Sequence, residues 1–273
     1  MKTAKKTRTF LSLSFLFSWL VWGGMLMFPI SAQFFIPLLF LGAFGPSLVA
    51  IYMVQTSRDS RAIKGFWLRV VDIRRIGWKW LLLIFLIFPM ILLVGYSFLF
   101  LLGEELPNFS SYFSGLGDFE AVAFFLTFMI LGGPLAEELG WRGYILDPLQ
   151  EKWGRLGGSI ILGSFWVLWH LPLFFIEGTS QFEKGFGIAF WSWSLQIMIL
   201  SVIFTWVYNH TQKSILAAVL LHFMANFAYP LDLDAKGEVV FSLVRLLVTL
   251  PIILSWYKGS PAKEKIVARF NLS

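Results

Sequence analysis

The segment Ala121–Tyr144 reads AVAFFLTFMILGGPLAEELGWRGY, in which a long apolar run is followed at once by two carboxylates and an arginine. Glu137, Glu138 and Arg142 are therefore expected at or inside a membrane boundary. A charge placed there costs roughly 3 kcal/mol on insertion scales, and such side chains usually face a protein interior or a wet cavity. The segment predicts a membrane protein and favours a membrane enzyme, because charges at this depth usually have a task.

The composition agrees with a membrane location. The chain has 273 residues, of which 58% are hydrophobic and 14% are charged, whereas a soluble domain carries about a quarter charged residues. Thirty phenylalanines and thirteen tryptophans suit lipid-facing surfaces and interfacial belts. The absence of cysteine excludes disulfides, a thiol nucleophile and cysteine-ligated zinc. We expect a multi-pass protein of the cell membrane, with the lipid bilayer as its surroundings.

Apolar stretches long enough to cross a bilayer fall at eight places. They are residues 10–30, 34–55, 78–102, 119–140, 158–176, 187–207, 214–230 and 239–257. An even count places both termini on one side, and 19 of the 22 lysines and arginines then lie on that side. Because basic loops stay in the cytoplasm, both termini are predicted to be cytoplasmic. The same bias accounts for the net charge of +6 without a nucleic-acid partner.

The chain divides by sequence into three parts. Residues 1–118 are expected to form an N-terminal three-helix membrane region with a basic cytoplasmic loop. Residues 119–230 hold the intramembrane polar groups and form the candidate catalytic core, and residues 231–273 form a last transmembrane helix with a basic tail. Within the basic loop, the segment 56–79 has apolar and basic faces. It is predicted to lie along the cytoplasmic surface as an amphipathic helix held by anionic lipid.

The two carboxylates after the apolar run are predicted to have separate tasks. Glu138 and Arg142 are four residues apart, so they share a helical face and can form an ion pair. Glu137 is rotated by about 100° from Glu138, which lets it point into a cavity. The alternative is a solvated helix end, at which both carboxylates and the arginine are exposed to water.

Two later segments bring further polar groups to overlapping depths. His170 is the one strongly polar side chain of the segment 158–176, and His222 and Asn226 share one face of the segment 214–230 because they are four residues apart. A lone buried histidine is more often a hydrogen-bonded core residue than a catalytic one, and for His170 both interpretations stay open.

Hydrolysis is the chemistry that these groups allow together. A carboxylate can take a proton from water and pass it to a leaving amine. One imidazole can hold that water or, together with the carboxylate, bind a divalent metal that acidifies it. A second imidazole and an amide are donors of the kind that stabilise an oxyanion.

The joint pattern resembles the CPBP family (CAAX proteases and bacteriocin-processing enzymes), intramembrane endopeptidases of the type II CAAX prenyl protease kind, also called Abi proteins. The pattern is Glu137-Glu138-x-x-x-Arg142, then His170 four residues after Trp166, then His222-x-x-x-Asn226. The resemblance covers Phe119–Pro230 in the family's motif order. One position departs from it, because the family's second motif usually begins with phenylalanine and Trp166 stands there in this chain.

The resemblance implies an all-α membrane protein of about eight transmembrane helices that enclose a polar cavity open to the cytoplasmic side. It implies Glu137 as the general base, His170 as the residue that positions water, and His222 with Asn226 as the oxyanion hole. Glu138 and Arg142 would support them, with Trp166 as a packing aromatic. The substrate would be a peptide or protein, and whether it is prenylated, membrane-anchored or a bacteriocin stays open.

The cofactor and two other functions also stay open. A divalent metal such as zinc could be held by Glu137, His170 and His222, or the mechanism could need no metal. The compact HExxH helix of known zinc peptidases is absent from the sequence. A transporter could use the same polar cavity for a ligand or a proton relay, and it would be expected to show broken helices and repeat-related halves. A non-catalytic bacteriocin-immunity protein could keep the same fold.

Overall fold

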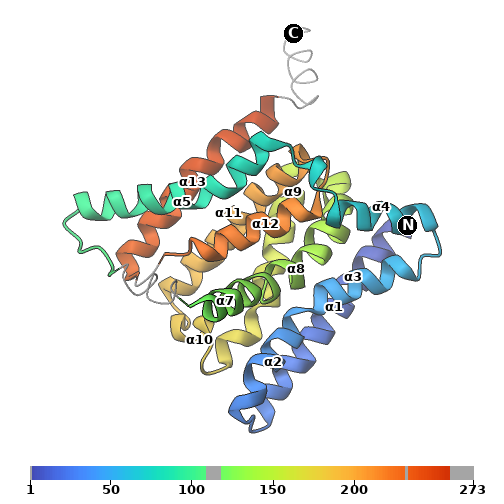
Figure 1. The fold of residues 1–273 in the computed structure, drawn as a ribbon, viewed down its shortest axis with the longest axis horizontal. Coiled ribbons are helices and arrows are strands. Elements are labelled where there is room, and N and C mark those ends of the chain that lie inside the picture. The colour runs from blue at the N-terminus through green and yellow to red at the C-terminus, as the bar shows by residue number, and fades with distance from the viewer. Residues whose placement is uncertain (1, 109–117, 231–232, 259–273) are drawn as a thin grey trace, which may run out of the picture.

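The computed structural model describes residues 2–108, 118–230 and 233–258, and the secondary structure of these residues is entirely helical (Figure 1). The helices of the first half are α1 (Lys2–Met27), α2 (Ala32–Ala43), α3 (Gly45–Gln55), α4 (Ser60–Val71), a 3-10 turn (Ile73–Arg75) and α5 (Trp78–Leu101). Those of the second half are α7 (Phe119–Leu131), α8 (Pro134–Gly140), a π-helical turn (Trp141–Ile145), α9 (Leu146–Trp169), a 3-10 turn (Leu171–Phe175), α10 (Ser180–Lys184), α11 (Ile188–His210), α12 (Ile215–Phe227) and α13 (Ala235–Lys258). The basic tail predicted after Tyr257 lies almost wholly outside the described residues.

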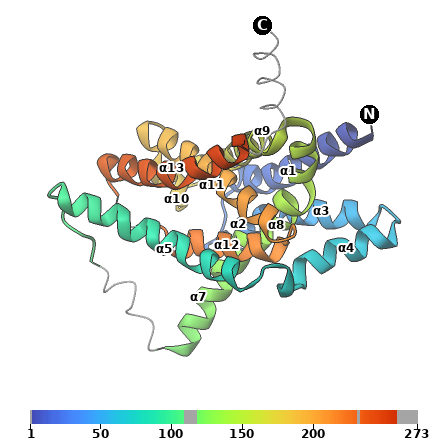
Figure 2. The ribbon, with the colours of Figure 1, turned by 90° about the horizontal axis from the view of Figure 1, so that it is seen from above.

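The helices form two layers, which are seen from above in Figure 2. One layer runs from α13 through α11 and α9 to α1, and each helix contacts the next. The other runs from α5 through α12 and α8 to α3, again with each helix in contact with its neighbour. Helices α8, α9 and α12, which carry the candidate site residues, therefore meet near the middle of the molecule.

The number of helices able to span a membrane is smaller than the sequence suggested. Among the described residues, five are long and apolar enough, or six if the bent pair α2–α3 counts as one span. The five are Ala4–Met27, Trp78–Leu101, Phe125–Phe175, Ile188–His210 and Lys236–Tyr257. The predicted eight spans are not confirmed. The expected spans 119–140 and 158–176 fall largely within one 51-residue stretch, and α12, with 13 residues, is shorter than the roughly 17 residues that a span needs.

Glycine and proline explain where the apolar stretches break. The predicted span 34–55 is bent by 46° between α2 and α3, where Gly45 and Pro46 begin the second helix. In the same way α7 ends before Gly132 and Gly133, and α8 begins with Pro134. Proline is favoured at the first helical position because its missing N–H would be unpaired there anyway. A continuous apolar run thus becomes two helices, and the second of them carries both carboxylates.

Helices α3 and α8 cross at very short distance. A Cβ atom on Gly140 would lie 2.6 Å from the backbone and ring atoms of Pro46, so only glycine fits at this crossing. One hydrogen bond also joins the two helices, because the hydroxyl of Ser47 donates to the carbonyl oxygen of Leu135 at 2.9 Å. The position of α8, and with it that of Glu137 and Glu138, is therefore set by the N-terminal helices.

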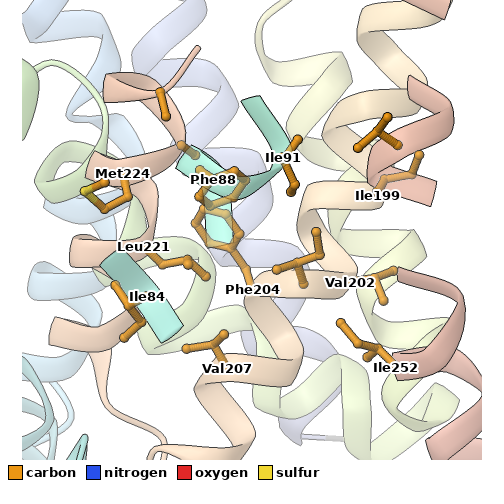
Figure 3. Close-up of a cluster of buried hydrophobic side chains, with 14 of the residues drawn as sticks. Ile84, Phe88, Ile91, Ile199, Val202, Phe204, Val207, Leu221, Met224 and Ile252 are labelled. Atoms are coloured by element: carbon orange, nitrogen blue, oxygen red, sulfur yellow. The ribbon is translucent and has the colours of Figure 1, made fainter. Parts of the chain in front are cut away.

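The largest buried apolar cluster joins α5, α11, α12 and α13 (Figure 3). Phe204 of α11 and Leu221 of α12 lie at its centre, and both are fully buried. Inside a bilayer such contacts stabilise the helix packing through close van der Waals contact, because lipid tails are as apolar as these side chains. The cluster fixes α12 against α11, and this contact sets the position of His222.

Helix α4 lies within the segment 56–79 that was expected to form an amphipathic helix. Asp59 caps its N-terminus by accepting from the N–H groups of Arg61 and Ala62. Its central aromatic residue, Phe66, is buried in a small cluster with Leu139 of α8 and two residues of α12. The amphipathic helix is present as predicted, and its apolar side packs largely against protein.

Arg69 of α4 ties this helix to the candidate core. Its guanidinium donates to the carbonyl oxygen of Gly143 at 2.8 Å and to the hydroxyl of Tyr208 at 2.6 Å. Gly143 lies in the π-helical turn that follows α8, so a residue of the basic loop contacts the segment that carries Arg142.

Candidate active site

Glu138 is the most fully bonded group between the two layers. Nη1 of Arg142 donates to both of its oxygens, at 2.8 and 3.0 Å, and Nδ1 of His222 lies 2.8 Å from Oε1. The ion pair expected from the four-residue spacing is present. The alternative of a solvated helix end is wrong, because the side chains of Glu138 and Arg142 are both 0% exposed.

The guanidinium of Arg142 lies between two aromatic rings. Its Cζ is 4.6 Å from the ring centroid of Trp166 and 4.4 Å from that of Phe204. Two of its nitrogens, Nε and Nη2, are buried and have no hydrogen-bond partner among the described residues. Cation–π attraction is strongest where water is excluded. The two rings therefore stabilise the positive charge on the side of the guanidinium that is not hydrogen-bonded to Glu138. Phe204 was not among the residues picked out from the sequence.

Glu137 is held by the indole of Trp166. Nε1 of Trp166 donates to Oε2 of Glu137 at 2.5 Å, and both side chains are buried. The phenylalanine that usually begins the second motif could not make this bond, because it has no donor. Trp166 is the one position that departs from the family pattern, and in the structure its indole makes a hydrogen bond to Glu137.

One ring nitrogen of His222 is hydrogen-bonded to Glu138, and the other lies on the opposite side of the ring. Because the carboxylate paired with Arg142 can only accept, Nδ1 of His222 carries the proton shared with Glu138. Its Nε2 is then directed toward Gly133, at the start of α8, together with the amide of Asn226. Asn226 lies one turn later on α12 and is exposed, whereas His222 is buried. His222 and Asn226, which the four-residue spacing placed on one face of their helix, thus both lie near the start of α8.

His170 lies beside this cluster. It follows the last residue of α9, and its Nδ1 is 2.8 Å from the carbonyl oxygen of Trp166. Its ring packs edge-on against Trp169 and Trp193, with centroids 4.7 and 5.3 Å apart. No direct hydrogen bond joins His170 to Glu137 in the described part of the chain. Trp166 contacts His170 and also bonds Glu137, so it is the residue that connects them.

The described residues do not fit the zinc site that the sequence left open. They contain no group of three or more histidine, aspartate or glutamate side chains placed to hold a metal ion. The carboxylate of Glu138 is already bonded to Arg142 and His222, and one oxygen of Glu137 is bonded to Trp166. The candidate ligands Glu137, His170 and His222 therefore do not converge as a ligand set.

Three features of the site were not found from the sequence. They are the ring of Phe204 against Arg142, the indole N–H of Trp166 on Glu137, and the bond from Arg69 to the π-helical turn. The first two could have been suspected, because aromatic residues surround each polar group in the sequence. The third joins residues that are 74 positions apart, and no local pattern indicates such a contact.

Comparison with known proteins identifies the family of this chain. The sequence model of the family described as "Type II CAAX prenyl endopeptidase Rce1-like" matches residues 119–228, the segment that contains α7 to α12. The chain is also 30% identical over 217 residues to CAAX prenyl protease 2 from Methanococcus maripaludis, an alignment that covers 78% of this chain and 79% of the relative. The resemblance noted from the motifs is confirmed, and the chain belongs to the type II CAAX prenyl endopeptidase family of membrane proteases.

Proposed function

We propose that this protein cleaves peptide bonds of membrane-anchored substrates, with a water molecule activated by Glu137. The observation that carries the proposal is the environment of this one carboxylate. Its Oε2 is fixed by Trp166, while its Oε1 is directed toward the same glycine, Gly133, as the ring nitrogen of His222 and the amide of Asn226. A base and two donors around one position are the parts that amide hydrolysis requires.

In the first step, Glu137 accepts a proton from water through Oε1 while the water oxygen attacks the carbonyl carbon. The electrons of the C=O bond move to its oxygen, which becomes an oxyanion. Nε2–H of His222 and the amide N–H of Asn226 donate to this oxygen. Because Nδ1 of His222 is already bonded to Glu138, the imidazole must carry a proton on each ring nitrogen to act as this donor.

In the second step, the tetrahedral intermediate collapses. The oxyanion re-forms the C=O bond, the C–N bond breaks, and Glu137 passes its proton to the leaving amine. The products are a carboxylic acid and a free amine, and Glu137 is again a carboxylate. Glu138 and Arg142 remain paired throughout and hold His222 in place. We assign His170, which is bonded to the backbone of Trp166, to the wall of the water-binding region.

The substrate class follows from the relative's name and from the membrane setting. We propose a protein or peptide whose C-terminal part is anchored by a prenyl group, with cleavage at the cytoplasmic face and both termini of the enzyme on that side. The transporter and immunity-protein alternatives are not favoured by membership in a protease family.

The test uses the purified full-length protein in liposomes, with a prenylated peptide and the same peptide without its lipid. Cleavage of the prenylated peptide, detected by mass spectrometry, is the expected result, and it should survive exhaustive chelation with metal content checked by elemental analysis. Loss of activity on chelation, restored by zinc alone, would contradict the metal-free mechanism. Failure to cleave either peptide, while an unrelated membrane-anchored peptide is cleaved, would contradict the substrate class only.

Trp166→Phe tests the bond to Glu137 without removing the aromatic ring. The variant loses one hydrogen bond to a charged group, which is worth about 1.5–3 kcal/mol, so kcat should fall roughly tenfold to a hundredfold. KM should stay the same, because the indole does not contact the body of the substrate.

A spectroscopic measurement separates this role from simple packing. The indole N–H proton of Trp166 should shift upfield in Glu137→Gln, in which the acceptor becomes a neutral amide oxygen. An unchanged indole resonance, together with an unchanged kcat for Trp166→Phe, would show that the bond has no part in the reaction.

A further inference from the structure

Gly133 lies where the base and the oxyanion donors converge. It is the residue immediately before α8, and its backbone is buried. A Cβ atom built on it would lie 3.2 Å from Nδ2 of Asn226, 3.3 Å from Nε2 of His222 and 3.5 Å from Oε1 of Glu137. Atoms of three side chains, from two helices, therefore face the same small volume.

The three neighbours are all polar, and this sets Gly133 apart from the other tightly packed glycines of the chain. A Cβ on Gly140 would meet Pro46, one on Gly95 would meet the ring of Phe241, and one on Gly42 would meet the ring of Trp22. At those positions glycine allows close packing of helices or aromatic rings. At Gly133 it leaves room among one carboxylate oxygen and two nitrogens, which are hydrogen-bonding atoms.

An oxygen atom fits this volume better than a methyl group does. A water or carbonyl oxygen that approached Gly133 from this side would meet three atoms that can form hydrogen bonds with it. A methyl group would fill the same volume, could not bond to any of the three, and would exclude water. All three neighbours are hydrogen-bonding atoms, and two of them belong to the buried side chains of Glu137 and His222, so the volume is suited to a polar occupant.

We infer that Gly133 is a positioning residue of the reaction: its lack of a side chain keeps open the place that the attacking water and the scissile carbonyl oxygen occupy. The inference rests on the proposed function, because it takes Glu137 as the base and His222 with Asn226 as the donors. It adds one rule: a bulkier residue at this position would block the scissile carbonyl of every substrate alike.

Gly133→Ala tests the inference with the smallest possible change. A misplacement of reacting groups by about 1 Å costs on the order of a hundredfold in rate, so kcat/KM should fall by at least that factor. Gly133→Ser should be as inactive as the alanine variant, because its hydroxyl would take the place of the water. Gly65→Ala is the matched control, since a Cβ there meets nothing within 4 Å, and it should cleave at the wild-type rate.

Thermal unfolding of each variant is measured beside the kinetics. The expected result is a wild-type midpoint for Gly133→Ala with the activity lost. Full activity in either Gly133 variant would overturn the inference. If Glu137→Gln is inactive and Gly133→Ala is active, the inference fails and the proposed function stands. If Glu137→Gln keeps full activity, the proposed base itself is wrong.

A measurement on the wild-type protein keeps the inference testable even if Gly133→Ala does not fold. A high-resolution experimental structure should show an ordered oxygen atom within hydrogen-bond distance of Oε1 of Glu137 and Nε2 of His222, against Cα of Gly133. A volume closed by a side chain, or one that holds no ordered oxygen, would overturn the inference.

Discussion

Glu137→Gln is expected to lower kcat by about a thousandfold, because general-base catalysis by a positioned side chain contributes roughly 10²–10⁴. The glutamine keeps the size of the side chain and keeps an oxygen for the indole N–H of Trp166. It removes only the ability to take a proton from water. Cleavage of the prenylated peptide in liposomes, followed by mass spectrometry, measures the loss.

The matched control for this variant is Glu151→Gln, on the exposed part of α9. It makes the same chemical change away from the site and should leave kcat at the wild-type value. Thermal unfolding of Glu137→Gln should stay close to wild type, because the buried contacts are preserved. A variant that is folded and fully active would refute the role given to Glu137.

Arg142→Met is expected to lower the free energy of unfolding by about 3–5 kcal/mol, since removal of one partner of a buried ion pair leaves the other charge uncompensated. The buried carboxylate of Glu138 would keep only the bond to His222, and the contacts with the rings of Trp166 and Phe204 would change from cation–π to apolar ones. Denaturant unfolding in detergent, followed by tryptophan fluorescence, measures the difference.

The double variant Glu138→Met/Arg142→Met separates stability from activity. Replacing a whole buried pair by apolar side chains of similar volume is often neutral or stabilising, so the double variant should recover most of the stability lost in Arg142→Met. Its cleavage activity should stay low, because Nδ1 of His222 has lost its acceptor. Full recovery of activity with stability would mean that the pair is needed for folding alone.

The parts of the site that share one helix could be predicted from the sequence. Glu138 and Arg142 lie one helical turn apart, as do His222 and Asn226, and periodicity alone places each pair on one face. The bond between Glu138 and His222 joins different helices, so it depends on how α8 packs against α12. The overlapping depths of the two pairs in the membrane, together with the family motif, indicated that they would meet, whereas the spacing within each helix did not.

The helix count could not be predicted because composition does not show where a helix breaks. The residues of 34–55 are apolar throughout, yet Gly45 and Pro46 begin a new helix at an angle of 46° to the first. Likewise, Gly132 and Gly133 separate α7 from α8 within a stretch that hydropathy treats as continuous. The interruptions are local backbone events, and the second one also places Gly133 close to the side chain of Glu137.

The bond from Arg69 to the carbonyl oxygen of Gly143 and the crossing of Gly140 over Pro46 bear on how this protein evolves. Residues 119–228 match the family model, but the helix with both carboxylates packs against a proline and a serine of α3, and the π-helical turn that follows it is bound by a side chain of α4. Substitutions in the first hundred residues can therefore reach the segment that carries Glu137, Glu138 and Arg142 through these contacts.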